Sequence, residues 1–182
     1  DEKAVGSASI AQVHRAELQD GTVVAVKVQR PGVVEQVTND LAIMERLVNI
    51  YDFVSKDDGL SVEDLVNEMI RTSTDELDFN NEAYNLERFY SNNEPREGVT
   101  SPRCFRDWTT SAVLTEDFAS APCVEKINPL GLSDDERERL AYLVARNFMQ
   151  QIMEDGFYHA DPHAGNVLIR DDGIEWIDFG MM

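Results

Sequence analysis

The segment HADPHAGNVLI, residues 159–169, places two histidines, an aspartate and an asparagine within eight residues. Asn166 follows Asp161 by five positions, and Asp178 opens the tripeptide Asp-Phe-Gly after a short predicted hairpin. Carboxylate and amide oxygens are the ligands that Mg²⁺ prefers, with water and phosphate completing its shell. Two acidic groups and an amide at the edge of one hairpin can therefore converge on a phosphate-bound divalent cation.

A lysine early in the chain completes this pattern. The motif VAVK ends in Lys27, and its apolar residues predict a buried strand. In the protein-kinase arrangement a strand lysine steadies the phosphates, a loop aspartate orients the nucleophile, and an asparagine and the aspartate of DFG hold Mg²⁺. Lys27, Asp161, Asn166 and Asp178 follow one another in that order. Each motif is weak alone, but their order and spacing together are specific.

The two histidines leave an alternative open. His159 and His163 with Asp161 between them form an HxDxH pattern, and imidazole nitrogens suit zinc. The preferred interpretation is that His159 supports the loop through a hydrogen bond.

Composition excludes some classes of protein. The chain of 182 residues has a formal net charge of −19, which argues against a nucleic-acid surface because phosphate binding needs clustered Lys and Arg. Its two cysteines, Cys104 and Cys123, lack CxxC spacing, so free thiols in a reducing compartment are expected. The sequence has no apolar run long enough to span a membrane. Lys27 therefore has to supply positive charge locally if a polyphosphate binds.

The elements that would position these residues begin with a hairpin. Residues 9–18 and 22–30 are β-branched runs on either side of Asp20-Gly21, a strong hairpin signal. After Pro31-Gly32, helical spacing predicts a long helix over residues 33–54, whose apolar positions are Val37, Leu41, Met44, Leu47 and Val48. Ser61 and Asp64 then form a capping-box pattern that opens one or two helices over residues 62–90, with a bend near Ser73-Thr74.

The second half alternates strands with a helix. Residues 99–118 predict a short strand pair, of which the second strand runs from Ala112 to Thr115. Ser133 and Glu136 predict a capped helix that ends at Gly156 and has an apolar face of Leu140, Leu143, Val144, Phe148 and Ile152. A last hairpin turns at Asp171-Asp172-Gly173.

This order predicts an α+β protein with two lobes. A mainly strand-bearing N-terminal lobe would be joined through residues 117–124 to a mainly helical C-terminal lobe. A cleft between lobes is where ligands usually bind.

Five segments carry a resemblance to a known family: SASIAQVH, VAVKVQRPGV, DELDFNNEAYN, DGFYHADPHAGNVLI and IDFG. They resemble the successive motifs of the UbiB family of atypical kinases, also called aarF-domain kinases, from about Val5 to Gly180. The resemblance implies a bilobal protein-kinase-like fold with a β-rich N-lobe carrying added helices (residues 1–118) and a truncated helical C-lobe (residues 119–182). It also implies ATP or ADP and Mg²⁺ as cofactors, and a role in ubiquinone, other quinone or lipid metabolism.

The resemblance also implies roles for individual residues. Asp161, Lys27 and Glu82 would be catalytic, with Glu82 the ion-pair partner of Lys27 and Glu76 its competitor. Asn166 and Asp178 would bind the metal, and Glu76 and Asp78 match the family's ExD signature. The nucleotide would contact Lys27, the hinge residues Glu116, Asp117 and Phe118, and the alanine-rich loop that comprises Gly6, Ser7, Ala8, Ser9, Ile10, Ala11 and Gln12.

The sequence also departs from the family pattern. Gly6-Ser7 stands where the family has alanines, and Ala11 where a glycine is common, so the preference between ATP and ADP stays open. The family's N-terminal KxGQ segment and the helices after DFG are absent, which makes the sequence read as a fragment. We expect a cytoplasmic protein whose membrane association, if any, lies outside these residues, with a nucleotide and quinone-pathway proteins or lipids as partners.

Three functions remain open at this stage. The first is a UbiB-type Mg²⁺-dependent ATPase or phosphotransferase. The second is a small-molecule phosphotransferase of the aminoglycoside- or choline-kinase type, which shares the HxDxxxxN loop but does not explain SASIAQVH. The third is a pseudokinase that binds nucleotide without turnover, which the intact lysine, aspartate and asparagine motifs disfavour.

Overall fold

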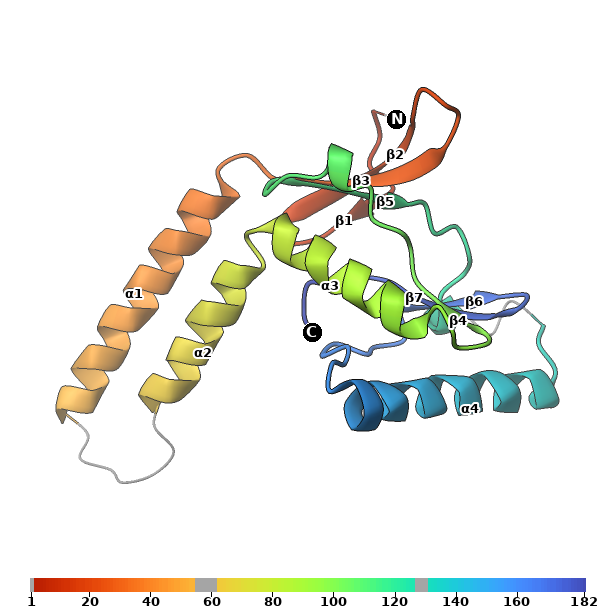
Figure 1. Cartoon of the computed structure of the whole chain (residues 1–182). Coiled ribbons are helices and arrows are strands. Elements are labelled where there is room, and N and C mark those ends of the chain that lie inside the picture. The colour runs from red at the N-terminus through yellow and green to blue at the C-terminus, as the bar shows by residue number, and fades with distance from the viewer. Residues whose placement is uncertain (1, 55–61, 127–130) are drawn as a thin grey trace.

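The computed structural model describes residues 2–54, 62–126 and 131–182, and it has two sheets with helices around them (Figure 1). The first sheet is antiparallel in the order β1-β2-β3-β5, and the second has the order β4-β7-β6. The strands of the first sheet are β1 Gly6–Ser7, β2 Ala11–Glu17, β3 Val23–Gln29 and β5 Val113–Asp117. Those of the second are β4 Val99–Thr100, β6 Val167–Arg170 and β7 Gly173–Trp176. The α+β class is confirmed.

The predicted first hairpin is confirmed. β2 and β3 pair antiparallel, and Gly21 takes the turn with a φ of 88°, a left-handed conformation that glycine adopts without steric cost. β5 pairs on the other side of β3, with Lys27 opposite Leu114 and Ala25 opposite Glu116. Residues directly opposite in an antiparallel pair project from the same face, so Lys27 and Glu116 share one face of this sheet.

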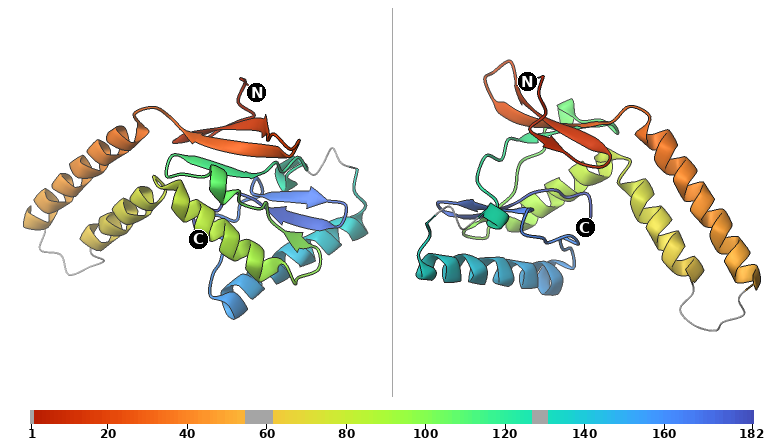
Figure 2. Two further views of the ribbon diagram at one scale, coloured as in Figure 1. Left: turned by 45° about the horizontal axis from the view of Figure 1, so that its top comes forward. Right: turned by 180° about the vertical axis from the view of Figure 1, so that it is seen from behind.

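Two helices, α1 Val33–Val54 and α2 Val62–Asp75, lie side by side and project away from the sheets (Figures 1 and 2). The long helix predicted over residues 33–54 is confirmed. Its predicted apolar face is only partly covered: Val37, Leu41, Met44 and Val48 are half-buried, whereas Leu47 is 60% exposed. The reason is that, among the described elements, α1 packs mainly against α2. Ser61, the predicted cap of the next helix, lies outside the described residues.

Residues 62–93 form two helices, which settles the alternative left open by the sequence. α2 ends at Asp75, and α3 Phe79–Asn93 begins after a break at residues 76–78, slightly beyond the bend predicted at Ser73-Thr74. Asp78 is the N-cap of α3, and its carboxylate accepts a hydrogen bond from the Asn80 amide at 2.9 Å. Because this side-chain bond replaces the main-chain bond that would continue α2, it fixes the start of α3.

The strand pair predicted within residues 99–118 is present only as a short antiparallel contact, in which Cys104 lies opposite Glu116 and the Phe105 amide donates to the Thr115 carbonyl at 2.9 Å. β4 runs parallel to β7, whereas β5 joins β3 in the other sheet. The segment between them contains a short 3₁₀ helix, η1 Arg106–Trp108. The hairpin predicted around Gly173 is confirmed as β6 and β7.

Helix α4 Asp134–Gln150 begins with the predicted capping box, in which Ser133 and Glu136 bond reciprocally. The helix continues as a π-helix, Gln151–Asp155, and Gly156 ends it with a φ of 55°. A π turn holds more residues than an α turn and so shifts the phase of the side chains that follow. Ile152, predicted on the buried face, is accordingly 39% exposed.

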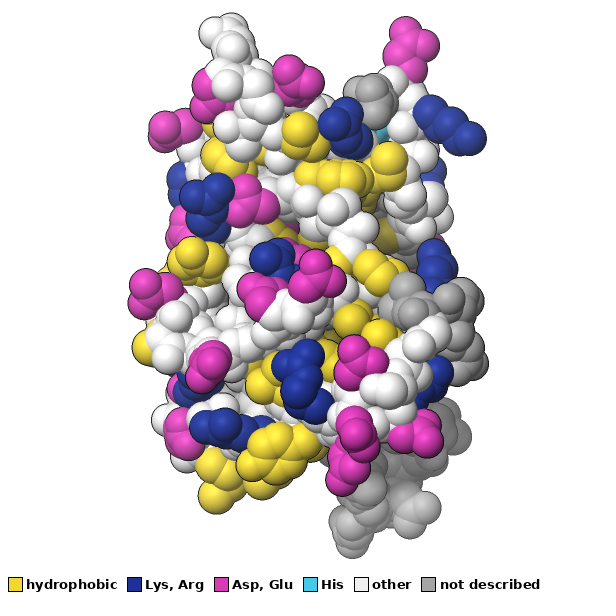
Figure 3. Space-filling view, turned by 90° about the vertical axis from the view of Figure 1, so that its right-hand side faces the viewer, with side chains coloured by type: hydrophobic (Ala, Val, Ile, Leu, Met, Phe, Trp, Pro, Cys, Tyr) yellow, Lys and Arg dark blue, Asp and Glu magenta, His cyan; other side chains and the backbone are white. Residues whose placement is uncertain are grey.

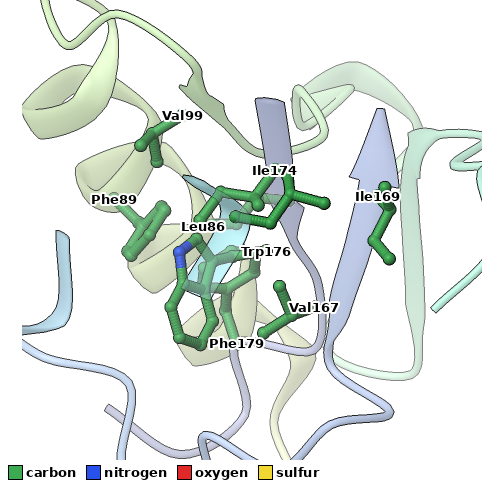
Figure 4. Packing of buried hydrophobic residues seen from close by; sticks show 9 residues of the cluster. Leu86, Phe89, Val99, Val167, Ile169, Ile174, Trp176 and Phe179 are labelled. Atoms are coloured by element: carbon green, nitrogen blue, oxygen red, sulfur yellow. The ribbon is translucent and has the colours of Figure 1, made fainter. Parts of the chain in front are cut away.

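The main core lies between α3, α4 and the second sheet. It contains Leu86, Phe89, Val99, Leu140, Val167, Ile169, Ile174, Trp176 and Phe179 (Figure 4). The Phe89 ring packs tilted on Phe179, with centroids 4.8 Å apart, and edge-on to Trp176 at 6.4 Å. This core therefore holds the DFG phenylalanine against the helix that carries Glu82.

On the face next to the β6–β7 hairpin, acidic and basic side chains are interspersed with apolar ones (Figure 3). Arg170 on this hairpin bonds Asp172 and Glu175, for example. Among the described helices, none combines the length and the apolar character needed to cross a bilayer.

Candidate nucleotide site

Lys27 and Glu82 form a bidentate ion pair between β3 and α3. The Lys27 Nζ atom lies 2.8 Å from Glu82 Oε1 and 2.9 Å from Oε2, and both side chains are largely buried. Nζ also lies 3.3 Å from Asp178 Oδ1. The structure thus brings together the lysine of VAVK, the glutamate of α3 and the aspartate of DFG.

The charges of this cluster follow from its geometry. Burial would lower the pKa of Lys27, but the carboxylates of Glu82 and Asp178 outweigh it and raise that pKa, so Lys27 stays charged. Burial raises the pKa of Glu82, although Lys27 opposes the shift. The amine is therefore a cation held among carboxylates at the lining of the cavities described below.

The loop that carries Asp161 is fixed from within. His159 is fully buried, and its Nε2 atom lies 3.0 Å from the Ile177 carbonyl oxygen, while its Nδ1 atom accepts the Asp161 amide at 3.3 Å. These bonds require the tautomer with the proton on Nε2, and burial lowers the pKa of His159 in agreement with a neutral ring. Asn166 Nδ2 donates to the Asp161 carbonyl at 3.1 Å. The predicted support of the loop by His159 is what the structure shows.

The DFG segment is held in an uncommon conformation. Asp178 has a φ of 66°, the left-handed region that non-glycine residues rarely adopt. Two contacts over-determine this conformation: Asn85 Nδ2 of α3 donates to the Phe179 carbonyl at 3.0 Å, and the Phe179 ring is fully buried. The Asp178 carboxylate remains half-exposed. Strain of this kind clusters at functional sites.

Two adjoining cavities meet at the Lys27 cluster. One, of about 130 Å³, is lined by Ala8, Ser9, Ile10, Lys27, Asp75, Glu76, Glu82, Asp161, Asn166, Asp178, Gly180 and Met181. The other, of about 360 Å³, is lined by Val5, Gly6, Ser7, Ala8, Val13, Ala25, Lys27, Glu82, Glu116, Asp117, Phe118, Ala119, Asn166, Ile177 and Asp178. Lys27, Asn166 and Asp178 belong to both. The smaller cavity, with its charged lining, is the polar end of the site. The larger cavity is the longer end, which reaches the predicted hinge residues.

Five of the seven predicted loop residues line these cavities, from Gly6 to Ile10. The other two lie elsewhere. Ala11 is fully buried in a small core with Phe79, Ala83 and Leu114, and Gln12 pairs within the sheet opposite Ser7. The sequence motif thus extends past the loop into β2, whose small residue makes room for α3.

The three predicted hinge residues differ in the contacts that their side chains make. All three line the larger cavity, and Asp117 also forms an ion pair with Arg103 at 2.8 Å. The Glu116 side chain, on the same sheet face as Lys27, points toward the cleft. Burial and the neighbouring Glu82 raise the pKa of Glu116 to about 8. The nucleotide contact at Glu116 stays a prediction, and the structure places its side chain at the lining of the cavity.

The ExD residues have separate roles. Glu76 lines the smaller cavity, and its pKa is raised by burial and by Asp178, whereas Asp78 caps α3. Glu82, not Glu76, is bonded to Lys27. Asp75, which the sequence did not indicate, also lines the cavity.

The zinc alternative does not fit this geometry. Both ring nitrogens of His159 are engaged by the main chain, and His163 Nδ1 accepts the Gly165 amide at 2.9 Å. Across the part of the chain that the structure describes, three or more His, Cys, Asp or Glu side chains nowhere gather as a metal site would require.

Comparison with curated proteins gives relatives that are named kinases. Protein ACTIVITY OF BC1 COMPLEX KINASE 7, chloroplastic, of Arabidopsis thaliana is 34% identical over 186 aligned residues, which cover 100% of this chain and 26% of that protein. AarF domain-containing protein kinase 1 of Xenopus laevis is 33% identical, over 92% of this chain and 32% of that protein. The chain thus spans about a third or less of the length of these relatives.

Solved structures share the fold. The complex of Rv3197 with erythromycin from Mycobacterium tuberculosis matches with a TM-score of 0.85 and 29% identity, covering 99% of this chain and 45% of that one. A Rio2 kinase complex with ADP, Mg²⁺ and phosphoaspartate, from Chaetomium thermophilum, matches with a TM-score of 0.51 and 15% identity, over 96% of this chain and 46% of that one. The predicted protein-kinase-like fold is confirmed.

The model of the ABC1 atypical kinase-like domain matches residues 1–182. Together with a relative named for its AarF domain, this match confirms the resemblance that the sequence motifs indicated. The chain belongs to the ABC1 atypical kinase-like family.

Proposed function

We propose that this domain binds ATP in the cleft between its sheets and performs Mg²⁺-dependent phosphoryl transfer or ATP hydrolysis. The observation that carries the proposal is the convergence of Lys27, Asn166 and Asp178 on both adjoining cavities. The phosphates would lie at the polar end, near Lys27 and the loop of small residues. The base would lie at the longer end, against Glu116 to Phe118.

The side chains at the polar end fit Mg²⁺. Asn166 uses its Nδ2 atom for the Asp161 carbonyl, which leaves its amide oxygen to face the cleft, and the Asp178 carboxylate is half-exposed beside it. Few protein oxygens combined with phosphate and water are the shell that Mg²⁺ accepts. Bound Mg²⁺ would neutralise charge on the phosphate oxygens.

The remaining chemistry belongs to the chain itself. Lys27, held by Glu82, keeps a positive charge where the phosphates would lie, and such positioning supplies most of the acceleration in phosphoryl transfer. Asp161, half-exposed at the cleft, orients water or an acceptor hydroxyl and accepts its proton.

The test compares Asp178→Asn with the control Asp171→Asn, a substitution in the exposed β6–β7 turn. In the full-length protein Mg·ATP should raise the melting temperature of wild type and control, because a ligand at 100 times its Kd adds about 2.7 kcal/mol to stability. Asp178→Asn should abolish the part of this shift that depends on Mg²⁺. Equal shifts with and without Mg²⁺ in the wild type would refute the proposal.

Asp161→Asn separates an enzyme from a binding module. We expect turnover to fall by about 10² to 10⁴-fold while the Kd for Mg·ATP stays nearly constant. Wild-type protein that binds Mg·ATP but releases no ADP with any lipid, quinone or amino-alcohol acceptor would favour a pseudokinase. Rapid phosphorylation of a soluble amino alcohol would favour the small-molecule phosphotransferase.

The role in quinone or lipid metabolism is a further part of the proposal, supported by the family resemblance of the motifs. Location in the cytoplasm also stays a prediction, and three relatives from Arabidopsis thaliana are named as chloroplastic.

A further inference from the structure

Three amide side chains are buried between the far end of α3 and the loop that carries Asp161. We call Asn93, Asn147 and Gln151 the buried amide network; their exposed fractions are 1%, 0% and 0%. Asn147 Nδ2 donates to Asn93 Oδ1 at 2.6 Å, and Gln151 Nε2 donates to Asn147 Oδ1 at 2.7 Å. Side-chain hydrogen bonds thus join α3, α4 and the π-helix inside the protein.

The network ends on the main chain of the loop. Gln151 Oε1 accepts the His159 amide at 2.9 Å. The His159 ring in turn bonds the Asp161 amide and the Ile177 carbonyl, which directly precedes Asp178. The Gln151 side chain therefore anchors His159, whose ring holds the main chain at Asp161 and next to Asp178.

The other end of the network lies on the helix that carries Glu82. Asn93 is the last residue of α3, and its Oδ1 atom also accepts a hydrogen bond from Arg96 Nη1 at 3.1 Å. Arg96 pairs with Asp155, the last residue of the π-helix, at 2.7 Å. The end of α3 is thus bonded twice to the segment that leads into the loop, once inside the core and once near the surface.

Stability alone does not account for these amides. A buried amide left unbonded costs about 1 to 3 kcal/mol, whereas apolar groups of the same shape can replace a bonded pair at almost no cost. Neighbouring positions on this face, such as Leu140 and Phe148, pack in the core. What a fully bonded polar network adds to an apolar core is one defined arrangement of the elements that it joins.

We propose that Gln151 is a positioning residue for Asp161, and that Asn147 couples the placement of α3 to it. The inference rests on the proposed function, because it concerns the loop that would orient the acceptor. Loss of the network would let the main chain at His159 shift, and a misplacement of about 1 Å near reacting groups can reduce a rate by about 10²-fold.

The experiment uses the full-length protein with Gln151→Met and Asn147→Leu, which keep the side-chain size but remove the hydrogen bonds. Asn147 makes no hydrogen bond to the loop. We expect both variants to speed hydrogen exchange of the His159 and Asp161 amides by about tenfold or more, measured by NMR without nucleotide. We also expect kcat to fall at least tenfold while the KM and Kd for Mg·ATP change less than threefold.

Leu140→Ala is the matched control, because Leu140 lies on the same helix in the same core but outside the network. It should lower the melting temperature without selectively loosening the loop, and its kcat should stay within threefold of wild type. The double variant Asn147→Leu/Gln151→Met should recover stability relative to Gln151→Met, because the Asn147 side-chain oxygen is no longer left unbonded, yet keep the low kcat.

Two results would overturn the proposal. One is an Asn147→Leu protein with wild-type exchange at His159 and wild-type kcat. The other is a double variant in which kcat recovers together with stability, which is the behaviour of a purely structural network. Failure of the proposed function is distinguishable, since it would appear as wild-type protein without a Mg·ATP-dependent shift, whereas the exchange measurements need no nucleotide.

Discussion

The Lys27–Glu82 pair shows what sequence reasoning could and could not resolve at the scale of a residue. The strand signal around VAVK placed Lys27 on a central strand, which the structure shows. Its partner was left open between Glu76 and Glu82, six positions apart. The choice depends on the break at residues 76–78, since only Glu82 lies within the buried face of α3.

Removing one member of the Lys27–Glu82 pair should lower the free energy of unfolding far more than removing both. Lys27→Met leaves the Glu82 carboxylate buried without its cation, which costs about 3 to 5 kcal/mol. In Lys27→Met/Glu82→Gln the charge is gone, and we expect more than half of that loss to be recovered. Urea unfolding of the four proteins in this cycle measures both values. If the losses in unfolding free energy of the two single variants simply add up in the double variant, the ion pair is solvated.

Glu116 predicts a dependence on pH. Its pKa is raised from 4.5 to about 8, so the stability that its neutral form contributes is complete below about 4.5 and is lost as pH rises through 8. Glu116→Gln stays neutral, and other groups cancel in the comparison. The unfolding free energy of the variant should therefore gain on wild type by at most about 1.4 kcal/mol per pH unit between these values. A difference that does not change between pH 5 and pH 9 would contradict this.

At the scale of elements, local signals were sufficient for most helices and hairpins. The capping box at Ser133 and Glu136 and the turn glycines Gly21 and Gly156 stand where predicted. The main strand partners of residues 99–118 were not predictable, because β4 pairs with β7 across more than 70 residues, β5 pairs with β3, and no local pattern records such partners. The π turn after Gln150 likewise has no sequence signature, and it moved Ile152 off the buried face.

The close approach of β4 and β7 requires a glycine at position 173. A Cβ atom on Gly173 would overlap the Gly98 carbonyl group, which is main chain and cannot rotate away. Gly173→Ala should therefore destabilise the protein by about 1 to 3 kcal/mol or more. Gly21→Ala is the control: it has open space and only the cost of its φ of 88°, about 1 kcal/mol. Thermal unfolding of both checks the order, and an equal loss would show that the crossing can relax.

At the scale of the whole molecule, the formal charge of −19 opposes compaction. Salt screens such repulsion, with a Debye length of about 30 Å at 0.01 M and about 10 Å at 0.1 M. We expect the melting temperature to rise when NaCl increases from 10 to 200 mM, by about 2 to 4 °C for each kcal/mol gained. A fall would mean that ion pairs such as Arg96–Asp155 outweigh the net charge.

The net negative charge also limits what can be predicted from composition alone. It predicts no nucleic-acid surface but gives no indication of where a polyanion could bind, which depends on Lys27 being held among carboxylates in a cleft. Motif order supplied that information. The cavities are lined by residues of the first sheet and of the loops next to the second. The arrangement of these two sheets, whose ribbons are seen in Figure 2, was not predictable from the sequence.

The left-handed backbone of Asp178 has a consequence for evolution and for engineering. An aspartate in this conformation stores about 1 kcal/mol or more of strain, and its charge crowds Glu82 and Glu76. A glycine there would remove both penalties and give up only a half-exposed contact with Lys27. Random selection for heat resistance alone should therefore enrich Asp178→Gly, a protein that melts higher and lacks the carboxylate proposed to bind Mg²⁺.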